Sequence, residues 1–126
     1  MSLKYWSAVV LLVAAPFAHA QSSDPLYGED AQAKAVLACH ADYARRYAAA
    51  ATSLRATATE VATAAQAACA GQMEAFLKSR ITDGSKEEQV AALMAPGRFV
   101  EHHRQRMGDY AFAYTIDAYL KASTPF

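Results

Sequence analysis

Two cysteines, Cys39 and Cys69, are the residues of this chain whose chemistry is most narrowly defined. Leu54 lies midway between them, and the stretches on either side repeat apolar residues at helical spacing. In an antiparallel helical hairpin, residues equidistant from the turn lie side by side. We therefore predict a Cys39–Cys69 disulfide. It closes a loop of about 30 residues, which contributes on the order of 3–4 kcal/mol by restricting the unfolded chain.

Other uses of the cysteine pair fit less well. Catalytic dithiols usually lie close in sequence at a helix N-terminus, commonly as C-x-x-C, whereas these two cysteines fall in the middle of predicted helices. Haem attachment needs C-x-x-C-H, and Cys39-His40 lacks the first cysteine of that motif. Two buried free thiols are the remaining alternative. A bridged pair cannot also bind a metal ion.

A histidine and a methionine define a second candidate site. His103 and Met107 are about one helical turn apart, and imidazole with a thioether sulfur is a ligand pair that can hold copper. His40 and His102 are further candidate ligands. An exported copper or zinc binder is thus an alternative function, but we expect no cofactor because nothing fixes a third or fourth ligand. The competing interpretation places His103 in the core, since the other residues of its stripe are apolar.

Four aromatic residues near the C-terminus are candidates for an interface. Tyr110, Phe112, Tyr114 and Tyr119 occupy more than one face of the helix predicted there. Tyrosine and phenylalanine are enriched in the cores of protein interfaces, so these rings are candidates for contact with a protein partner or a second copy. The competing interpretation is that they wrap the core of a monomer and turn their hydroxyls to solvent.

Motifs of catalysis are missing from the sequence. It contains no G-x-S-x-G, no glycine-rich phosphate loop and no H-E-x-x-H, since Glu101-His102-His103 has the wrong spacing. The arginines are scattered among acidic residues, which is typical of solvated faces. We therefore predict that the protein is not an enzyme.

The elements that must position these residues begin after an export signal. Lys4 supplies a positive charge, residues 8–17 form an apolar run, and Ala18-His19-Ala20 is an A-x-A cleavage site. The run is too short to span a bilayer, which takes about 20 apolar residues. We predict a signal peptide at 1–20 and a secreted chain, most simply in the bacterial periplasm, where cysteines are oxidised. No membrane span is expected in the mature chain.

Composition indicates a single small helical domain. The chain is rich in alanine, the best helix former, and poor in turn-bounded β-branched runs. Its 12 basic and 12 acidic residues balance, which argues against nucleic acid as a partner. Residues 21–29 carry Pro, Gly, Ser and Asp and are predicted to be a flexible N-terminal segment. Residues 30–126 are predicted to form the domain.

Four helices are predicted, at about 30–52, 57–82, 85–94 and 98–122. Asp30 is a candidate N-cap of the first. Thr57 with Glu60, and Ser85 with Glu88, match the capping-box pattern at the next two helix starts. The apolar stripes are expected to face inward: Val36, Cys39, Tyr43 and Tyr47; Val61, Ala65, Cys69, Met73, Phe76 and Leu77; Val90, Leu93 and Met94; Phe99, His103, Met107, Tyr110 and Tyr114.

Three glycines carry specific expectations. Gly71 is expected to allow close approach of two helices, and Gly84 to end its helix in the left-handed conformation. Gly108 could divide the last helix, although one continuous helix is favoured. The fold class is therefore all-α: a small bundle of three long helices and one short one, with the first two joined as a disulfide-stapled antiparallel hairpin.

The function that best fits these features is a non-catalytic binding or structural protein of the cell envelope. One specific version is an immunity-type inhibitor of a toxin enzyme delivered to the periplasm. Another is a self-associating envelope protein. The chain is similar to small periplasmic immunity proteins and acid-stress chaperones in size, export and helicity, but it contains no motif of either, so no residue role is transferred.

Overall fold

The computed structural model describes residues 27–50 and 56–124. That part of the chain forms five helices: α1 (Ala31–Ala50), α2 (Ala58–Ala68), α3 (Ala70–Asp83), α4 (Lys86–Met94) and α5 (Pro96–Ser123). The predicted signal peptide and Leu54, the expected midpoint of the hairpin, lie outside the described residues. No helix within the described ranges is both long enough and apolar enough to cross a membrane.

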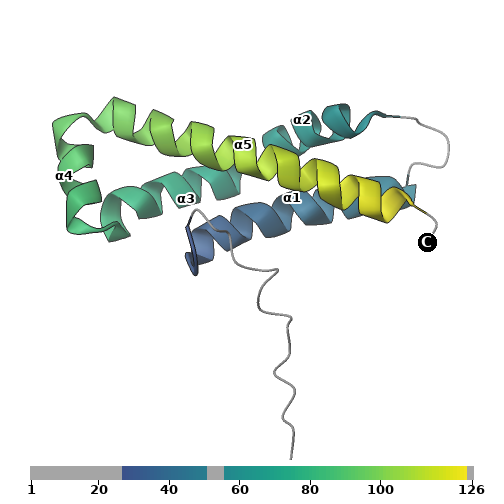
Figure 1. The fold of residues 1–126 in the computed structure, drawn as a ribbon, viewed down its shortest axis with the longest axis horizontal. Coiled ribbons are helices and arrows are strands. Elements are labelled where there is room, and N and C mark those ends of the chain that lie inside the picture. Colours follow the sequence, from purple (N-terminus) through teal and green to yellow (C-terminus); the bar gives the residue numbers. More distant parts are fainter. Residues whose placement is uncertain (1–26, 51–55, 125–126) are drawn as a thin grey trace, which may run out of the picture.

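The helices form an elongated bundle, which confirms the predicted fold class. α5 runs the length of the molecule and packs on α1 and α2, and α3 packs on α1 (Figure 1). α4 lies across one end and joins α3 to α5. The predicted count of three long helices and one short helix is too low, because the second long helix is divided into α2 and α3.

The division falls at Cys69, where φ is −102° and ψ is 17°. The backbone angles leave the helical range at this one residue, but the hydrogen bonds continue across it: the Cys69 N–H donates to the Ala65 carbonyl at 2.8 Å, and the Met73 N–H donates to the Cys69 carbonyl at 3.2 Å. Gly71, two residues later, is not used for close packing: a Cβ there would meet no atom within 4 Å. The expectation for Gly71 is therefore wrong, because its face of α3 points to solvent.

The starts of α1, α2 and α4 are as predicted. The Asp30 carboxylate accepts the Ala33 N–H at 2.8 Å, which caps α1. Both capping boxes are present, Thr57 with Glu60 at α2 and Ser85 with Glu88 at α4. Each box satisfies backbone N–H groups that the first turn of a helix leaves free.

Gly84 ends α3, but not in the expected conformation. Its φ of −70° and ψ of 170° are extended, so the left-handed prediction is wrong. Glycine is needed there for space, because a Cβ would lie 2.6 Å from the carbonyl oxygen of Arg80.

α5 begins two residues earlier than predicted and does not break. Pro96 occupies the first helical position, where its missing N–H removes no hydrogen bond. The helix continues through Gly108, as favoured from the sequence.

The core is built by small residues of α1 against larger ones of α3 and α5. Phe76, Leu77 and Met107 are its large members. On α1 the buried positions are Ala33, Val36, Leu37, His40, Ala41 and Ala44. The predicted α1 stripe is thus displaced: Tyr43 and Tyr47 are half-buried at its edge, because alanines let the helices approach more closely than tyrosines would.

The prediction of which face of α4 is buried is wrong. Val90, Leu93 and Met94, expected inside, are 58%, 82% and 81% exposed. α4 instead faces the bundle with Ala92, its one buried residue. Because α4 crosses the end of the bundle, only its Ala92 side packs on the other helices, and its large apolar side chains are left exposed.

Candidate functional site

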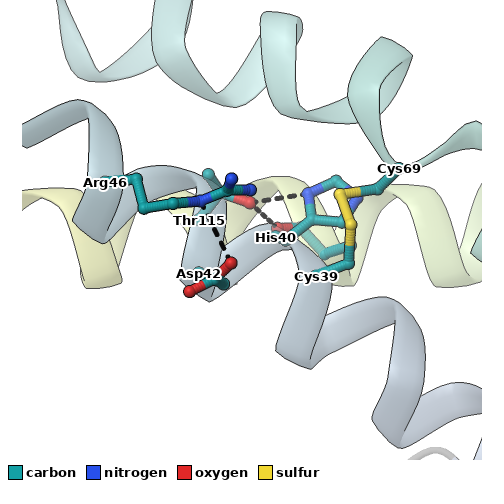
Figure 2. Close-up of a disulfide and its surroundings, with 7 residues drawn as sticks. Cys39, His40, Asp42, Arg46, Cys69 and Thr115 are labelled. Atoms are coloured by element: carbon teal, nitrogen blue, oxygen red, sulfur yellow. Dashed lines mark hydrogen bonds and ion pairs between the residues drawn. A yellow bond between two sulfur atoms is a disulfide. The ribbon is translucent and has the colours of Figure 1, made fainter.

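The Cys39–Cys69 disulfide is present and joins the middle of α1 to the junction of α2 and α3 (Figure 2). The two Cα atoms are 6.0 Å apart, within the range that disulfides require. The two sulfurs are therefore bonded to each other and cannot serve as metal ligands. The disulfide holds the end of α2 and the start of α3 against the middle of α1, beside His40, the next residue of α1.

His40 is buried and hydrogen-bonded to α5. Its Nδ1 lies 2.8 Å from Oγ1 of Thr115 (Figure 2). Thr115 Oγ1 in turn donates its only hydrogen to the Ala111 carbonyl at 2.6 Å. Thr115 can therefore only accept from His40, so Nδ1 carries the proton and Nε2 of the neutral ring has a free lone pair.

Burial lowers the pKa of His40, because the charged imidazolium loses its hydration in the bundle. The ring is thus neutral at physiological pH. The hydroxyl beside a histidine suggests a nucleophile and base, but Thr115 is 0% exposed. Its hydroxyl is out of reach of a substrate and ties the helix backbone instead.

A cavity of about 280 Å³ opens beside His40. It lies where α1, α2, α3 and α5 meet, next to the disulfide. Its lining is mostly polar: His40, Gln66, Ala70, Met73, Glu74, Arg104, Gln105, Gly108 and Asp109. Within this set, Arg104 donates to Glu74 at 2.7 Å.

A second cluster is centred on Tyr27, which precedes α1. The Tyr27 hydroxyl and Nδ1 of His103 are joined by a hydrogen bond of 2.9 Å. The Tyr27 ring packs edge-on against Phe76, with a centroid distance of 4.8 Å. The guanidinium carbons of Arg80 and Arg106 lie 5.4 Å and 5.9 Å from the ring centroid, within cation–π range. Tyr27 thus attaches the end of the predicted N-terminal segment to two helices, α3 and α5.

Glu88 connects this cluster to α4. Its Oε2 lies 3.5 Å from Nε of Arg80 and 3.6 Å from Nε2 of His103. These distances are long for hydrogen bonds, and both Arg80 Nε and Glu88 Oε2 are buried without a hydrogen-bond partner. Arg80 also faces Asp30 at 3.9 Å. Arg80 on α3 is therefore attracted by Asp30 at the start of α1 and by Glu88 on α4, but at distances longer than those of hydrogen-bonded ion pairs.

The pKa of His103 is lowered, first by burial. Glu88 opposes that shift, while His102, Arg80 and Arg106 add to it. A neutral imidazole is consistent with the Tyr27 hydrogen bond. A cavity of about 400 Å³ borders the cluster, lined by Tyr27, Arg80, Glu87, Glu88, Ala91, Phe99, His102, His103 and Arg106.

The proposed metal ligands are not brought together. His40 and His103 line different cavities, and Met107 is fully buried in the core. Across residues 27–50 and 56–124, no group of three or more His, Cys, Asp or Glu side chains is arranged to hold a metal ion. Copper or zinc binding by these residues stays a prediction.

The four aromatic candidates of α5 are half-buried. The rings of Tyr110 and Tyr114 stack with a centroid distance of 6.4 Å and pack against the core. Tyr119 donates to the Ala56 carbonyl at 3.2 Å, and its ring lies 6.3 Å from that of Tyr47. Contacts within the chain thus account for three of the rings. Phe112 is equally half-buried, and its part in an interface stays a prediction.

The most exposed large apolar side chains lie at the α4 end of the molecule. Besides the three on α4, Ile81 at the end of α3 is 42% exposed. A shallow groove of about 480 Å³ runs between α3 and the start of α5 at the same end, lined by Glu74, Ala75, Leu77, Lys78, Ile81 and Val100. An apolar helix face and an apolar groove are therefore neighbours.

Sequence reasoning missed Tyr27, Arg80 and Thr115. The contacts that give them roles join residues 76 and 75 positions apart in two cases, Tyr27 with His103 and His40 with Thr115. The sequence offered one indication of a role for Tyr27: it is the single aromatic residue of the segment 21–29.

Comparison of the chain with protein-family models, curated proteins and solved structures finds no significant match. The fold and the site therefore define the chain only as a disulfide-stapled helical bundle.

Proposed function

We propose that this chain is an exported, non-catalytic protein of the cell envelope that acts by self-association, with the outer face of α4 as its docking element. The observation that carries the proposal is the exposure of Val90, Leu93 and Met94 on that one face.

The orientation of α4 is the reverse of that of an ordinary surface helix. Such a helix buries its apolar stripe and exposes its polar side, whereas α4 buries Ala92 and exposes three large apolar side chains. Fully burying side chains of this kind contributes about 1.5–3 kcal/mol each. Apolar residues at i, i+3 and i+4 are also the anchors by which a helix docks into a groove.

A second copy of the chain offers a matching surface. The groove between α3 and α5 is lined by Ala75, Leu77, Ile81 and Val100 and lies at the same end as α4. Two copies related by a twofold axis can therefore each insert α4 into the groove of the other. Such an interface uses the same patch on both copies and closes on itself, as in most soluble homodimers.

The sequence supports the remaining parts of the proposal. The A-x-A pattern at Ala18-His19-Ala20 and a disulfide between widely separated cysteines both fit an oxidising, extracytoplasmic compartment. In the Thr115–His40 contact, the one that most resembles a catalytic pair, the Thr115 hydroxyl is closed to substrates. These observations therefore support a binding function over a catalytic one.

Light scattering coupled to size exclusion tests the proposal on the form of the protein that cells accumulate after export. We expect a dimer for the wild type and a monomer for the double variant Leu93→Ser, Met94→Ser. Both side chains are exposed, so the variant should keep its helical circular dichroism.

Leu120→Ser is the matched control, because Leu120 is 53% exposed and belongs to the last turns of α5, whose C-terminal end lies opposite α4 (Figure 1). It should remain a dimer. A monomeric wild type at high concentration overturns self-association and leaves a different protein, such as a delivered toxin, as the occupant of the α4 face. A dimer that survives the double variant places the interface elsewhere.

A further inference from the structure

We infer that the cavity beside the disulfide, lined by His40 and Asp109, binds a small alkylammonium ion. The Nε2 atom of His40 would accept an N–H of the ligand, and the Asp109 carboxylate would balance its charge. This inference is independent of self-association, because the cavity lies between α1, α2, α3 and α5 and not on α4.

The acceptor atom is Nε2 of His40. The hydrogen bond with Thr115 holds the ring and places the proton on Nδ1. Nε2 has no hydrogen-bond partner among the described residues. Among the described residues, the fully buried side-chain atoms that lack a hydrogen-bond partner are Arg80 Nε and Glu88 Oε2. His40 Nε2 lacks a partner but is not one of these buried atoms, so it is accessible from the cavity that His40 lines. A residue that is only 2% exposed thus presents an oriented lone pair.

The charges around the cavity favour a cation. Arg104 and Glu74 neutralise each other at 2.7 Å. Asp109 forms no ion pair within the described part of the chain, and it leaves the lining with one net negative charge. An anion would meet both this carboxylate and the lone pair of His40. A neutral donor would satisfy only His40.

The size and the remaining lining define the ligand further. About 280 Å³ is at the small end of ligand sites, which suits a short chain better than a ring system. Met73 and Ala70 offer an apolar wall for its carbon atoms, and the amides of Gln66 and Gln105 can accept further N–H groups. A primary amine carrying a short alkyl chain meets all of these conditions. Among the described residues, no three His, Cys, Asp or Glu side chains are arranged here to hold a metal ion.

Nuclear magnetic resonance titration with n-butylammonium chloride tests the site. The ¹⁵N signal of His40 Nε2 should shift as its lone pair accepts a hydrogen bond, with saturation at millimolar concentrations, since so small a ligand makes few contacts. Sodium butyrate should leave the signal unchanged, and n-butanol should bind at least about fivefold more weakly because it lacks the charge.

Two variants make the assignment specific. Gly108→Leu should abolish the shift, because a side chain at Gly108 meets no atom within 4 Å and extends into the space it lines. Asp109→Asn should weaken binding about fivefold. Asp117→Asn is the matched control on the same helix, since Asp117 pairs with Lys121 at 2.8 Å and lies outside this cavity. It should bind as the wild type does.

Three results would overturn the inference: no shift of Nε2 at saturating n-butylammonium, equal binding of n-butanol, or unchanged binding in Gly108→Leu. Each is informative only in folded protein, which the unperturbed amide spectrum of each variant establishes. A shift that survives in Gly108→Leu would place the amine elsewhere on the surface.

Discussion

His40 acquires its properties from a hydrogen bond to α5 and from its burial in the bundle. Thr115 fixes its tautomer, and burial in the bundle lowers its pKa. His103 resembles His40 in both respects: its Nδ1 shares a hydrogen bond with the Tyr27 hydroxyl, and burial lowers its pKa. At the residue scale, two of the three histidines that were candidate metal ligands, His40 and His103, are therefore neutral, oriented residues of the interior.

Acid should destabilise the protein through these histidines. The unfolded chain has an ordinary histidine pKa of about 6.5, and the folded pKa is lower. Below pH 6.5 or so the unfolded state therefore binds more protons, and the free energy of unfolding falls until the folded pKa is passed. Urea unfolding at about pH 7.5 and about pH 5.5 should show this loss.

The variant His40→Asn separates the contribution of His40, because an amide can replace Nδ1–H but does not titrate. It should lose less stability than the wild type between the two pH values, whatever its stability at the higher one. An identical pH response in His40→Asn would contradict the argument.

Glu88 has two roles, and a matched pair of substitutions distinguishes them. Glu88→Gln keeps the capping-box hydrogen bond to Ser85 but removes the charge that faces Arg80. We expect it to lower the free energy of unfolding by about 1–2 kcal/mol, less than for a fully buried pair because Glu88 is partly exposed. Glu60→Gln, in a capping box without such a partner, should cost a few tenths. Equal costs would show that the ion cluster contributes nothing.

At the scale of elements, features encoded within a few residues could be predicted from the sequence. The two capping boxes, the Asp30 cap and the continuity of α5 depend on neighbours in sequence, and all are present. The disulfide followed from symmetry about Leu54. The orientation of α4 could not be predicted, because a periodic pattern identifies an apolar face but not whether a neighbour covers it.

The glycines give a second test at this scale. Gly108→Ala should stabilise the protein by about 0.5–1 kcal/mol, because α5 is helical there and the added methyl meets open space. Gly84→Ala should destabilise it by about 1–3 kcal/mol, since its Cβ would collide with the Arg80 carbonyl. Chemical denaturation measures both, and the same sign for the two substitutions would contradict the structure.

At the scale of the whole molecule, the disulfide and the long-range polar contacts hold a core made largely of alanine. Cys39→Ser with Cys69→Ser should lower the free energy of unfolding by about 3–4 kcal/mol, because the bridge closes a loop between residues 30 positions apart. Reduction of the wild type should reproduce most of that loss, and the double variant should not respond to reductant. A loss below about 1 kcal/mol would mean that the native bundle, not the bridge, sets the stability.

The surface proposed for self-association belongs to this scale as well, and it could not be predicted from the sequence. From the sequence, the aromatic residues of the last helix were the interface candidates, but Tyr110, Tyr114 and Tyr119 are engaged within the chain. The three most exposed large apolar side chains among the described residues lie instead on α4, which crosses one end of the bundle (Figure 1). A short helix forced to cross that end has only one side to bury, and the chain places alanine on it.

Native mass spectrometry of the protein recovered after export measures the central claim most directly. Its mass should be that of two chains, each lacking residues 1–20 and each two hydrogens lighter than the reduced form. A single chain under non-denaturing conditions at micromolar concentration and above would contradict self-association through α4.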